Sequence, residues 1–306
     1  MTLTAEQVRA QLPDLARAAE DADGVAPLSE QTLLTARRGQ ASDDTTSARG
    51  TEGTDEGEPA MVWHDVDGEL IAIAISDASR TSYELVVHPA HRRHGYGASL
   101  LDLVVNEHSP GARVWAHGDL PAARSLATSH GLRVVRELWM MARPVLGEPA
   151  IAEPSLPTGF ASRHLVPGAD DEAWLAVNAR AFAHHPEQGR MTLADLQERM
   201  QQDWFDPRGL LLIEDVSGQD PVLAASHWTK IEPPGAAEGE VYVVAVDPAY
   251  QGLGLGRAVT ALGLAHLAAA GVRTIDLYVE GDNAPAIATY RGWGFEKASA
   301  DVMYTL

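Results

Sequence analysis

The chain of 306 residues contains no cysteine and only two lysines, Lys230 and Lys297. Without cysteine, disulfide bonds, thiolate metal sites and a cysteine nucleophile are all excluded. No apolar run approaches the roughly 20 residues that span a bilayer, and the first residues lack the basic and apolar regions of a signal peptide. These absences predict a cytoplasmic protein that does not act in a membrane.

Positive charge is scarce as well. The 23 lysines and arginines stand against 43 aspartates and glutamates, which gives a formal net charge of −20. Nucleic acids and anionic membranes bind basic surfaces, so neither is expected as a partner. The length suggests about two domains. The expected partner is a small molecule, and the expected state of the chain is a monomer.

One segment combines a strand, a turn and a glycine-rich loop that opens into a helix. The apolar strand 241–246 is followed by Asp247-Pro248, the loop 251–257 and the apolar, helix-like stretch 258–269. The N–H groups at such a helix start are unpaired and carry partial positive charge, so they can hold a pyrophosphate. The spacing is Gln-x-x-Gly-x-Gly-Arg, and no Gly-Lys-Ser/Thr follows, which argues against Rossmann and P-loop sites.

This order of strand, turn, loop and helix resembles the acyl-CoA pyrophosphate loop of the GCN5-related N-acetyltransferases. The resemblance implies an α/β fold of the α+β type, in which a mixed, mostly antiparallel sheet is flanked by helices and splits beside the cofactor loop. It also implies acetyl-CoA as co-substrate. The implied cofactor contacts are Val244, Ala245, Val246, Gln251, Gly252, Leu253, Gly254, Leu255, Gly256, Arg257, Asn283, Ala284, Pro285, Ala286, Ile287 and Ala288.

The same pattern occurs earlier in the chain, where Val87-His88-Pro89 precedes Gly95-Tyr96-Gly97. A repeat this long indicates two copies of one domain, because solenoid repeats are only about 20–50 residues long. The predicted domains are 1–146 and 158–306, joined by a proline-containing linker at 147–157. In the first copy the implied cofactor contacts are Leu85, Val86, Val87, Arg93, His94, Gly95, Tyr96, Gly97 and Ala98.

Hydrophobic periodicity and capping signals predict the remaining elements. Helices are expected at 4–19, 30–38, 171–182 and 192–201, and strands at 61–64, 69–76, 81–87, 210–214, 222–229 and 240–246. Each copy then closes with a β-like segment, a helix, a Gly-apolar pair and a last strand. Residues 41–60 are polar and predict a mobile surface loop, to which we assign no role.

The two copies differ where the family places its acid. Aligned on Gly131-Leu132 and Gly294-Phe295, they set Tyr290 opposite Ala127. In the family that the chain resembles, the tyrosine of Asn-x-x-Ala-x-x-x-Tyr protonates the departing CoA thiolate. A phenol with a pKa of about 10 suits that acid role. A tyrosine that only packs in a core or interface is the alternative.

The base is expected on the strand before the loop. Strand alternation puts one set of side chains on a single face: Glu240, Tyr242, Val244 and Val246. The family often places a carboxylate at the position of Glu240. The first copy has Thr81 there, while Glu84 matches Val243 and should point the other way. The second copy is therefore expected to catalyse transfer and the first at most to bind acetyl-CoA. A solvated strand-end carboxylate is the alternative for Glu240.

Nearly the whole chain, including Leu277–Asn283 and Val302-Met303-Tyr304, resembles the family of tandem acetyltransferases that make mycothiol in actinobacteria. The resemblance implies acetyl transfer to the cysteinyl amine of cysteinyl-glucosaminyl-inositol, with the acceptor between the two halves. The implied acceptor contacts are Glu30, Glu187, Lys230, Glu240 and Tyr278. Glu187 as a surface acid and Tyr278 as a packing residue remain open alternatives.

Two further observations bear on the acceptor site. Lysine is nearly absent although arginine is common, so Lys230 is a candidate for a position that needs a compact charge, with an ordinary surface lysine as the alternative. His184 and His185 precede Glu187, but adjacent side chains point apart and no third ligand is evident, so no metal is expected.

Two other functions fit the same motifs. One is an acetyltransferase for a different amine, such as an aminoglycoside, a polyamine or a peptide N-terminus. The other is an acyl-CoA sensor in which neither copy turns over. Glu240 and Tyr290 argue against the sensor, because binding alone needs neither.

Overall fold

The computed structural model describes residues 3–38, 59–77, 79–108, 111–183 and 188–306. Contacts divide the chain into two compact units. Unit 1 comprises Met1–Trp139, Glu280–Asp282 and Ser299–Leu306, and unit 2 comprises Met140–Val279 and Asn283–Ala298. Among the described helices, none combines the length and the apolar character that crossing a membrane requires.

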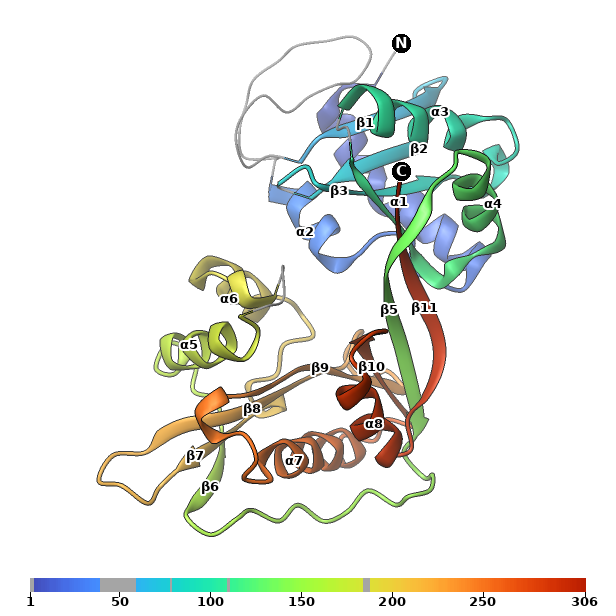
Figure 1. Cartoon of the computed structure of the whole chain (residues 1–306). Coiled ribbons are helices and arrows are strands. Elements are labelled where there is room, and N and C mark those ends of the chain that lie inside the picture. The colour runs from blue at the N-terminus through green and yellow to red at the C-terminus, as the bar shows by residue number, and fades with distance from the viewer. Residues whose placement is uncertain (1–2, 39–58, 78, 109–110, 184–187) are drawn as a thin grey trace. The chain divides into compact units, whose positions relative to one another are not determined.

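Unit 1 is a mixed sheet with helices on both faces (Figure 1). Strands β1 to β3 are antiparallel neighbours, β4 lies parallel to β3, and β11 pairs antiparallel with β4. In chain order the elements are α1 (Ala5–Asp23), α2 (Glu30–Arg38), β1 (Met61–Val66), β2 (Glu69–Ser76), β3 (Ser82–Val87), α3 (Tyr96–Asp102), a π-helical segment (Leu103–His108), β4 (Arg113–Ala116), α4 (Pro121–Ser129) and the start of β5 (Arg133–Pro144).

The apolar stripe of α1 anchors this unit. A capping box starts the helix, since Thr4 accepts from the N–H of Gln7 and the Gln7 side chain accepts from the N–H of Thr4. Val8 and Leu12 on the helix pack with Ile73 of β2 on one face of the sheet. Helix α3 and the π-helical segment cover the opposite face, so β2 is buried from both sides.

Unit 2 repeats the arrangement. Strands β6 to β9 are antiparallel neighbours and β10 runs parallel to β9. Its elements are the end of β5, β6 (Phe160–His164), α5 (Asp171–Ala181), α6 (Leu193–Met200), β7 (Leu210–Asp215), β8 (Val222–Lys230), β9 (Glu238–Val246), α7 (Leu255–Ala269), β10 (Thr274–Glu280), α8 (Ala284–Gly292) and the start of β11 (Glu296–Thr305).

A separate hydrophobic cluster packs on each face of the sheet of unit 2. Helices α5 and α6 cover one face, where the rings of Trp174 and Trp204 lie 5.4 and 5.8 Å from Trp228, and α7 covers the other (Figure 1). Gly263 lets α7 approach β8, because a Cβ there would lie 2.0 Å from the His227 ring. Burial lowers the pKa of His227 to about 4, so the imidazole is neutral, and its Nδ1 donates to the carbonyl of Val259 at 3.0 Å.

The described elements agree closely with the periodicity of the sequence. The predicted bounds of α2 and β2 are those observed, whereas β6 was not predicted. The polar stretch 41–60 lies almost entirely outside the described residues. The predicted domain boundaries at 146 and 158 remain a prediction, and the two units cross them, since β5 and β11 each contribute residues to both.

Candidate active site

In unit 2, two parallel strands separate beside the glycine-rich loop. β9 pairs with β10 only from Glu238 to Val241, whereas its pairing with β8 continues to Val246. Tyr242 is the extra residue of a bulge at this point, and bulges bend and twist a strand. Beyond Val241, the β10-facing edge of β9 therefore has no strand partner among the described residues. The predicted cofactor contacts Val244, Ala245 and Val246 lie on this open stretch.

Hydrogen bonds of Asp247 hold the turn that directly follows β9. The Asp247 side chain accepts from the N–H of Ala249 at 2.9 Å and binds Arg180 at 2.6 and 2.9 Å. Burial of Asp247 would raise its pKa, but these hydrogen bonds hold the pKa below its ordinary value, so the carboxylate stays ionised.

The glycines of the loop place a helix start at its end. Gly252 and Gly254 have φ of 81° and 83°, a left-handed region that favours glycine. Gly254 caps α7 without a side-chain hydrogen bond, so no side chain claims the first N–H groups of this 15-residue helix. The positive end of the helix dipole is thereby available to a phosphate.

The other predicted cofactor contacts of unit 2 lie around the starts of α7 and α8. The Leu255 and Ile287 side chains are buried, so these residues can offer a ligand only their main chain. Arg257 is exposed, with its guanidinium 5.4 Å from the centre of the Trp293 ring. Asn283 starts α8 by accepting from the N–H of Ala286 at 3.1 Å. The remaining contacts are exposed or half-buried: Gln251, Gly256, Leu253, Ala284, Pro285 and Ala288.

Tyr290 lies on α8, half-buried, with its ring 5.9 Å from that of Phe295. Its hydroxyl makes no hydrogen bond with any residue that the structure describes. Desolvation by burial raises the pKa of Tyr290 above its ordinary value of 10.0, so the phenol keeps its proton over the working range of pH. These surroundings fit a proton donor.

Glu240 occupies the middle of a row of charged side chains. Lys230 on β8 and Asp276 on β10 are both register partners of Glu240 on β9. Register partners project from the same face of a sheet, so the three side chains lie side by side just before the strands separate. The Lys230 ammonium lies 2.7 Å from Glu232 and 4.9 Å from the centre of the Trp204 ring.

The prediction from sequence missed Asp276. It stands two residues before Tyr278, which is 50% exposed, on the same face of β10. The motif at 277–283 drew attention to Tyr278, whereas Asp276 gains its position from the register of β10 against β9, which the sequence pattern does not specify.

The predicted acceptor contacts fall into three groups. Lys230, Glu240 and Tyr278 belong to unit 2, and Glu30, at the start of α2, belongs to unit 1. Glu187 lies outside the described residues, as do His184 and His185. The shared site that these residues were predicted to form stays a prediction.

Unit 1 contains a cavity of ≈ 410 Å³ beside its own strand split. β3 and β4 pair only as far as Glu84 and Trp115. The cavity is lined by every cofactor contact predicted for the first copy except His94: Leu85, Val86, Val87, Arg93, Gly95, Tyr96, Gly97 and Ala98. Ala127, the counterpart of Tyr290, also lines it and packs in one apolar cluster with Tyr304 of β11.

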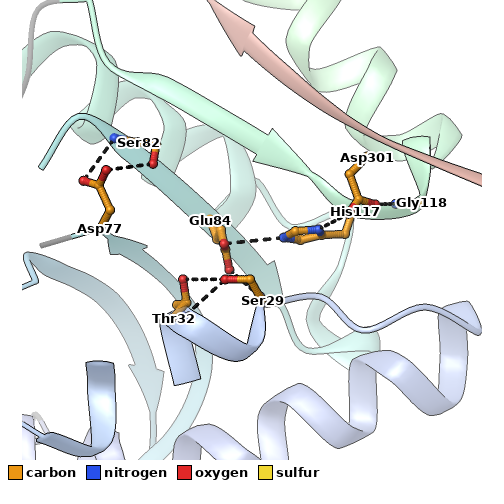
Figure 2. A network of polar contacts seen from close by, with 8 residues as sticks. All are labelled: Ser29, Thr32, Asp77, Ser82, Glu84, His117, Gly118 and Asp301. Carbon is orange, nitrogen blue, oxygen red and sulfur yellow. Dashed lines mark hydrogen bonds and ion pairs between the residues drawn. The ribbon is translucent and has the colours of Figure 1, made fainter. Parts of the chain in front are cut away.

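At the split of unit 1, charged side chains form ion pairs with one another. Figure 2 shows His117 between Glu84 and Asp301, with its Nδ1 2.9 Å from Asp301 and its Nε2 3.6 Å from Glu84. The second Glu84 oxygen accepts from the N–H of Ser29 at 2.7 Å. Burial alone would lower the pKa of His117, but the two carboxylates raise it to about 10. Both oxygens of Glu84 are therefore engaged, and the paired imidazolium is a poor base.

The chain is similar in sequence to known acetyltransferases. The model of the acetyltransferase (GNAT) family matches residues 177–295. A mycothiol acetyltransferase of Cellulomonas flavigena is 49% identical, covering 92% of this chain and 81% of that protein. Mycothiol acetyltransferases of Catenulispora acidiphila and Kytococcus sedentarius are each 46% identical, covering 97% and 99% of this chain and 95% of each relative.

Solved structures show the same fold. A GCN5-related N-acetyltransferase from Sphaerobacter thermophilus matches with a TM-score of 0.64 and 22% identity, covering 100% of this chain and 94% of that one. A tandem GNAT protein of the clavulanic acid biosynthesis pathway matches with a TM-score of 0.67 and 18% identity, covering 99% and 96%. The predicted fold class, two tandem acetyltransferase domains of α+β type, is confirmed.

Proposed function

Because this chain belongs to the mycothiol acetyltransferase family, we propose that it transfers the acetyl group of acetyl-CoA to the cysteinyl amine of cysteinyl-glucosaminyl-inositol, releasing mycothiol and CoA. Membership of this family confirms the resemblance that the sequence motifs indicated. It also makes the protein an acetyl-CoA-dependent N-acetyltransferase. The observation in unit 2 that carries the proposal is the open edge of β9 beyond Val241, followed by the start of α7 at Gly254.

This arrangement fits acetyl-CoA. The open edge offers main-chain groups of Val244–Val246 to the amides of the pantetheine arm, as a further strand would pair with it. The uncapped start of α7 offers its N–H groups to the pyrophosphate, and the exposed Arg257 adds positive charge.

In the proposed reaction, Glu240 takes a proton from the acceptor ammonium, directly or through water. The neutral amine attacks the thioester carbonyl, and a main-chain amide near Val246 stabilises the oxyanion. The C–S bond breaks as the tetrahedral centre collapses, and Tyr290 gives its proton to the CoA thiolate. The nitrogen passes its second proton through water to the Tyr290 phenolate, and Glu240 releases the first proton to solvent. The amide product retains the acetyl group, and no covalent acyl-enzyme is formed.

We assign catalysis to unit 2 and a binding role to unit 1. Unit 1 has Ala127 where the acid would stand, and the carboxylate at its strand split is held by His117 and Ser29. Its cavity and its loop at Gly95 still suit the cofactor, so we propose that unit 1 binds acetyl-CoA without turning it over. Acceptor contacts from Glu30 and Glu187, a monomeric state and a cytoplasmic location are further parts of the proposal.

The test is CoA release by the full chain with acetyl-CoA and the cysteinyl acceptor, compared with glucosaminyl-inositol that lacks cysteine. Rapid release with the cysteinyl compound alone is expected. Release with neither compound would overturn the proposed acceptor, and screening with aminoglycosides, polyamines and peptides would then separate another amine substrate from a sensor.

A further inference from the structure

Asp276 belongs to the row formed with Lys230 and Glu240, but it has no role in the sequence motifs or in the proposed mechanism. Asp276 lies on β10, the strand next to the predicted base, in register with Glu240. Tyr278, a predicted acceptor contact, follows two residues later on the same face. Asp276 is thus flanked by predicted acceptor residues along its own strand and across the sheet.

The surroundings of this carboxyl group are unusual for a structural residue. Asp276 is half-buried, yet no hydrogen bond or ion pair with a described residue reaches it. Burying a carboxylate without a partner is unfavourable. A cation that arrives with the substrate would supply the missing partner.

We infer that Asp276 is a further substrate-binding residue of the acceptor site, where its carboxylate binds the protonated amine that Glu240 then deprotonates. This inference rests on the proposed function. An ammonium has three N–H donors, so it can bind both carboxylates at once. Asp276 holds the amine beside the base and transfers no proton itself.

The charges around Asp276 give the inference a pH signature. The pKa of Asp276 is raised to about 6, mainly by burial and also by the negative charge of Glu238. The positive charge of Lys230 opposes this shift. Glu240 on β9 and Tyr278 on β10 are further titratable groups on the same faces, and Glu280 at the end of β10 is paired with Arg136 of the neighbouring β5. Because only the carboxylate binds the amine, acceptor affinity should fall as the pH drops below about 6.

Asp276→Asn is the decisive variant, since it keeps the shape and removes the charge. Equilibrium binding is measured by calorimetry with saturating CoA, using the cysteinyl acceptor and a desamino analogue that carries a 3-mercaptopropionyl group. The variant should bind the cysteinyl acceptor about 10- to 100-fold more weakly, as expected for loss of a charge-assisted hydrogen bond. It should bind the desamino analogue and CoA as the wild type does, and lose the fall in affinity near pH 6.

A second variant and a stability measurement exclude a merely structural role. Glu238→Gln leaves Asp276 in place and should move the acid limb of acceptor binding to lower pH. Because the folded state disfavours the Asp276 carboxylate, Asp276→Asn should maintain or raise the free energy of unfolding at neutral pH, whereas loss of a structural contact would lower it.

Three other binding results would each contradict either the role of Asp276 or the proposed function. If the wild type binds the cysteinyl acceptor and Asp276→Asn binds it equally well, the role of Asp276 is overturned while the proposed function stands. Equal weakening for the cysteinyl and desamino compounds also overturns it, because the contact would then not be to the amine. If the wild type binds no cysteinyl acceptor, the proposed function fails and the inference fails with it.

Discussion

Tyr290 and Ala127 stand at matching positions of the two copies, and their surroundings differ as much as their side chains. The Tyr290 hydroxyl is free of hydrogen bonds to described residues, and burial raises its pKa. Ala127 instead packs with Tyr304 in an apolar cluster. At the scale of single residues, we therefore propose that the proton donor belongs to the second copy.

Tyr290→Phe tests this acid role. The change removes the donated proton and keeps the ring that packs on Phe295. Turnover should fall about 100-fold, the lower range for loss of a general acid, with little change in acetyl-CoA affinity. Steady-state kinetics and CoA binding provide the two readouts, and unchanged turnover would remove Tyr290 from the mechanism.

Glu240→Gln tests the base, with Glu238→Gln as its matched control two residues earlier on the same strand face. Loss of the base should lower kcat/KM for the acceptor about 100-fold or more at neutral pH. The control should stay close to the wild type at pH 8, where Asp276 is ionised in both. Similar losses in the two variants would indicate a general effect of negative charge instead of proton removal.

The sequence predicts the residues that belong to a local motif and misses those placed by the sheet. Glu240 and Tyr290 were predicted because each has a fixed spacing from the glycine loop or from Asn283. Asp276 was missed because α7 separates β10 from β9, and a local sequence pattern does not set the register of such parallel strands.

At the scale of elements, the two glycine loops form a matched pair. Gly254 and Gly95 have φ of 83° and 88°, each caps a helix, and a Cβ at either would touch nothing within 4 Å. Alanine at either position therefore strains the backbone without a steric clash.

Gly254→Ala should raise the KM for acetyl-CoA about tenfold, since a left-handed alanine costs about 1–2 kcal/mol. Gly95→Ala should leave the KM and kcat near their wild-type values, because unit 1 is proposed not to catalyse. Steady-state kinetics of the two variants decides. A larger effect from Gly95→Ala would contradict the assignment of catalysis to unit 2.

The His117 cluster connects β4 to the end of β11 within unit 1. His117 contacts both Glu84 and Asp301, and the N–H of Gly118 donates to Asp301 at 2.8 Å. Since the pKa of His117 is raised to about 10 in the folded state, its stabilising effect is full below the ordinary pKa of 6.5 and is lost as the pH rises to about 10.

His117→Gln should lower the free energy of unfolding of unit 1 by roughly 3 kcal/mol at pH 6, as expected when a buried charge loses its partner. The difference from the wild type should shrink toward pH 10. The free energy of unfolding is measured by urea unfolding, with hydrogen exchange of the β4 amides as the probe of unit 1. His130→Gln is the control, because His130 lies 3.4 Å from the exposed Asp102 and should contribute less than about 1 kcal/mol. A pH-independent loss would contradict the charge assignment.

Elements with a strong apolar period were predicted well, and β6 was not. Its five residues, Phe160–His164, include two polar side chains and one arginine, and Arg163 binds Asp170 and Glu214. Polar edge strands lack the alternation on which prediction depends. The pairing of β11 with β4 was likewise beyond the sequence, because it joins segments far apart in the chain.

At the scale of the whole molecule, the two copies share a fold, and we propose that they differ in chemistry. The family model covers residues 177–295, which fall within the second copy. Relatives at 46–49% identity extend the match over nearly the full chain. We propose that duplication kept the cofactor geometry in both copies, while a base and an acid stand together only in the second.

The most direct test of this account is the position of the transferred acetyl group. The full chain is incubated with acetyl-CoA carrying an isotope label in its acetyl group and with cysteinyl-glucosaminyl-inositol, and the product is examined by NMR and mass spectrometry. The account predicts one labelled acetyl per acceptor, on the cysteinyl nitrogen. Label on a sugar hydroxyl, or label recovered only as free acetate or unreacted acetyl-CoA, would contradict it.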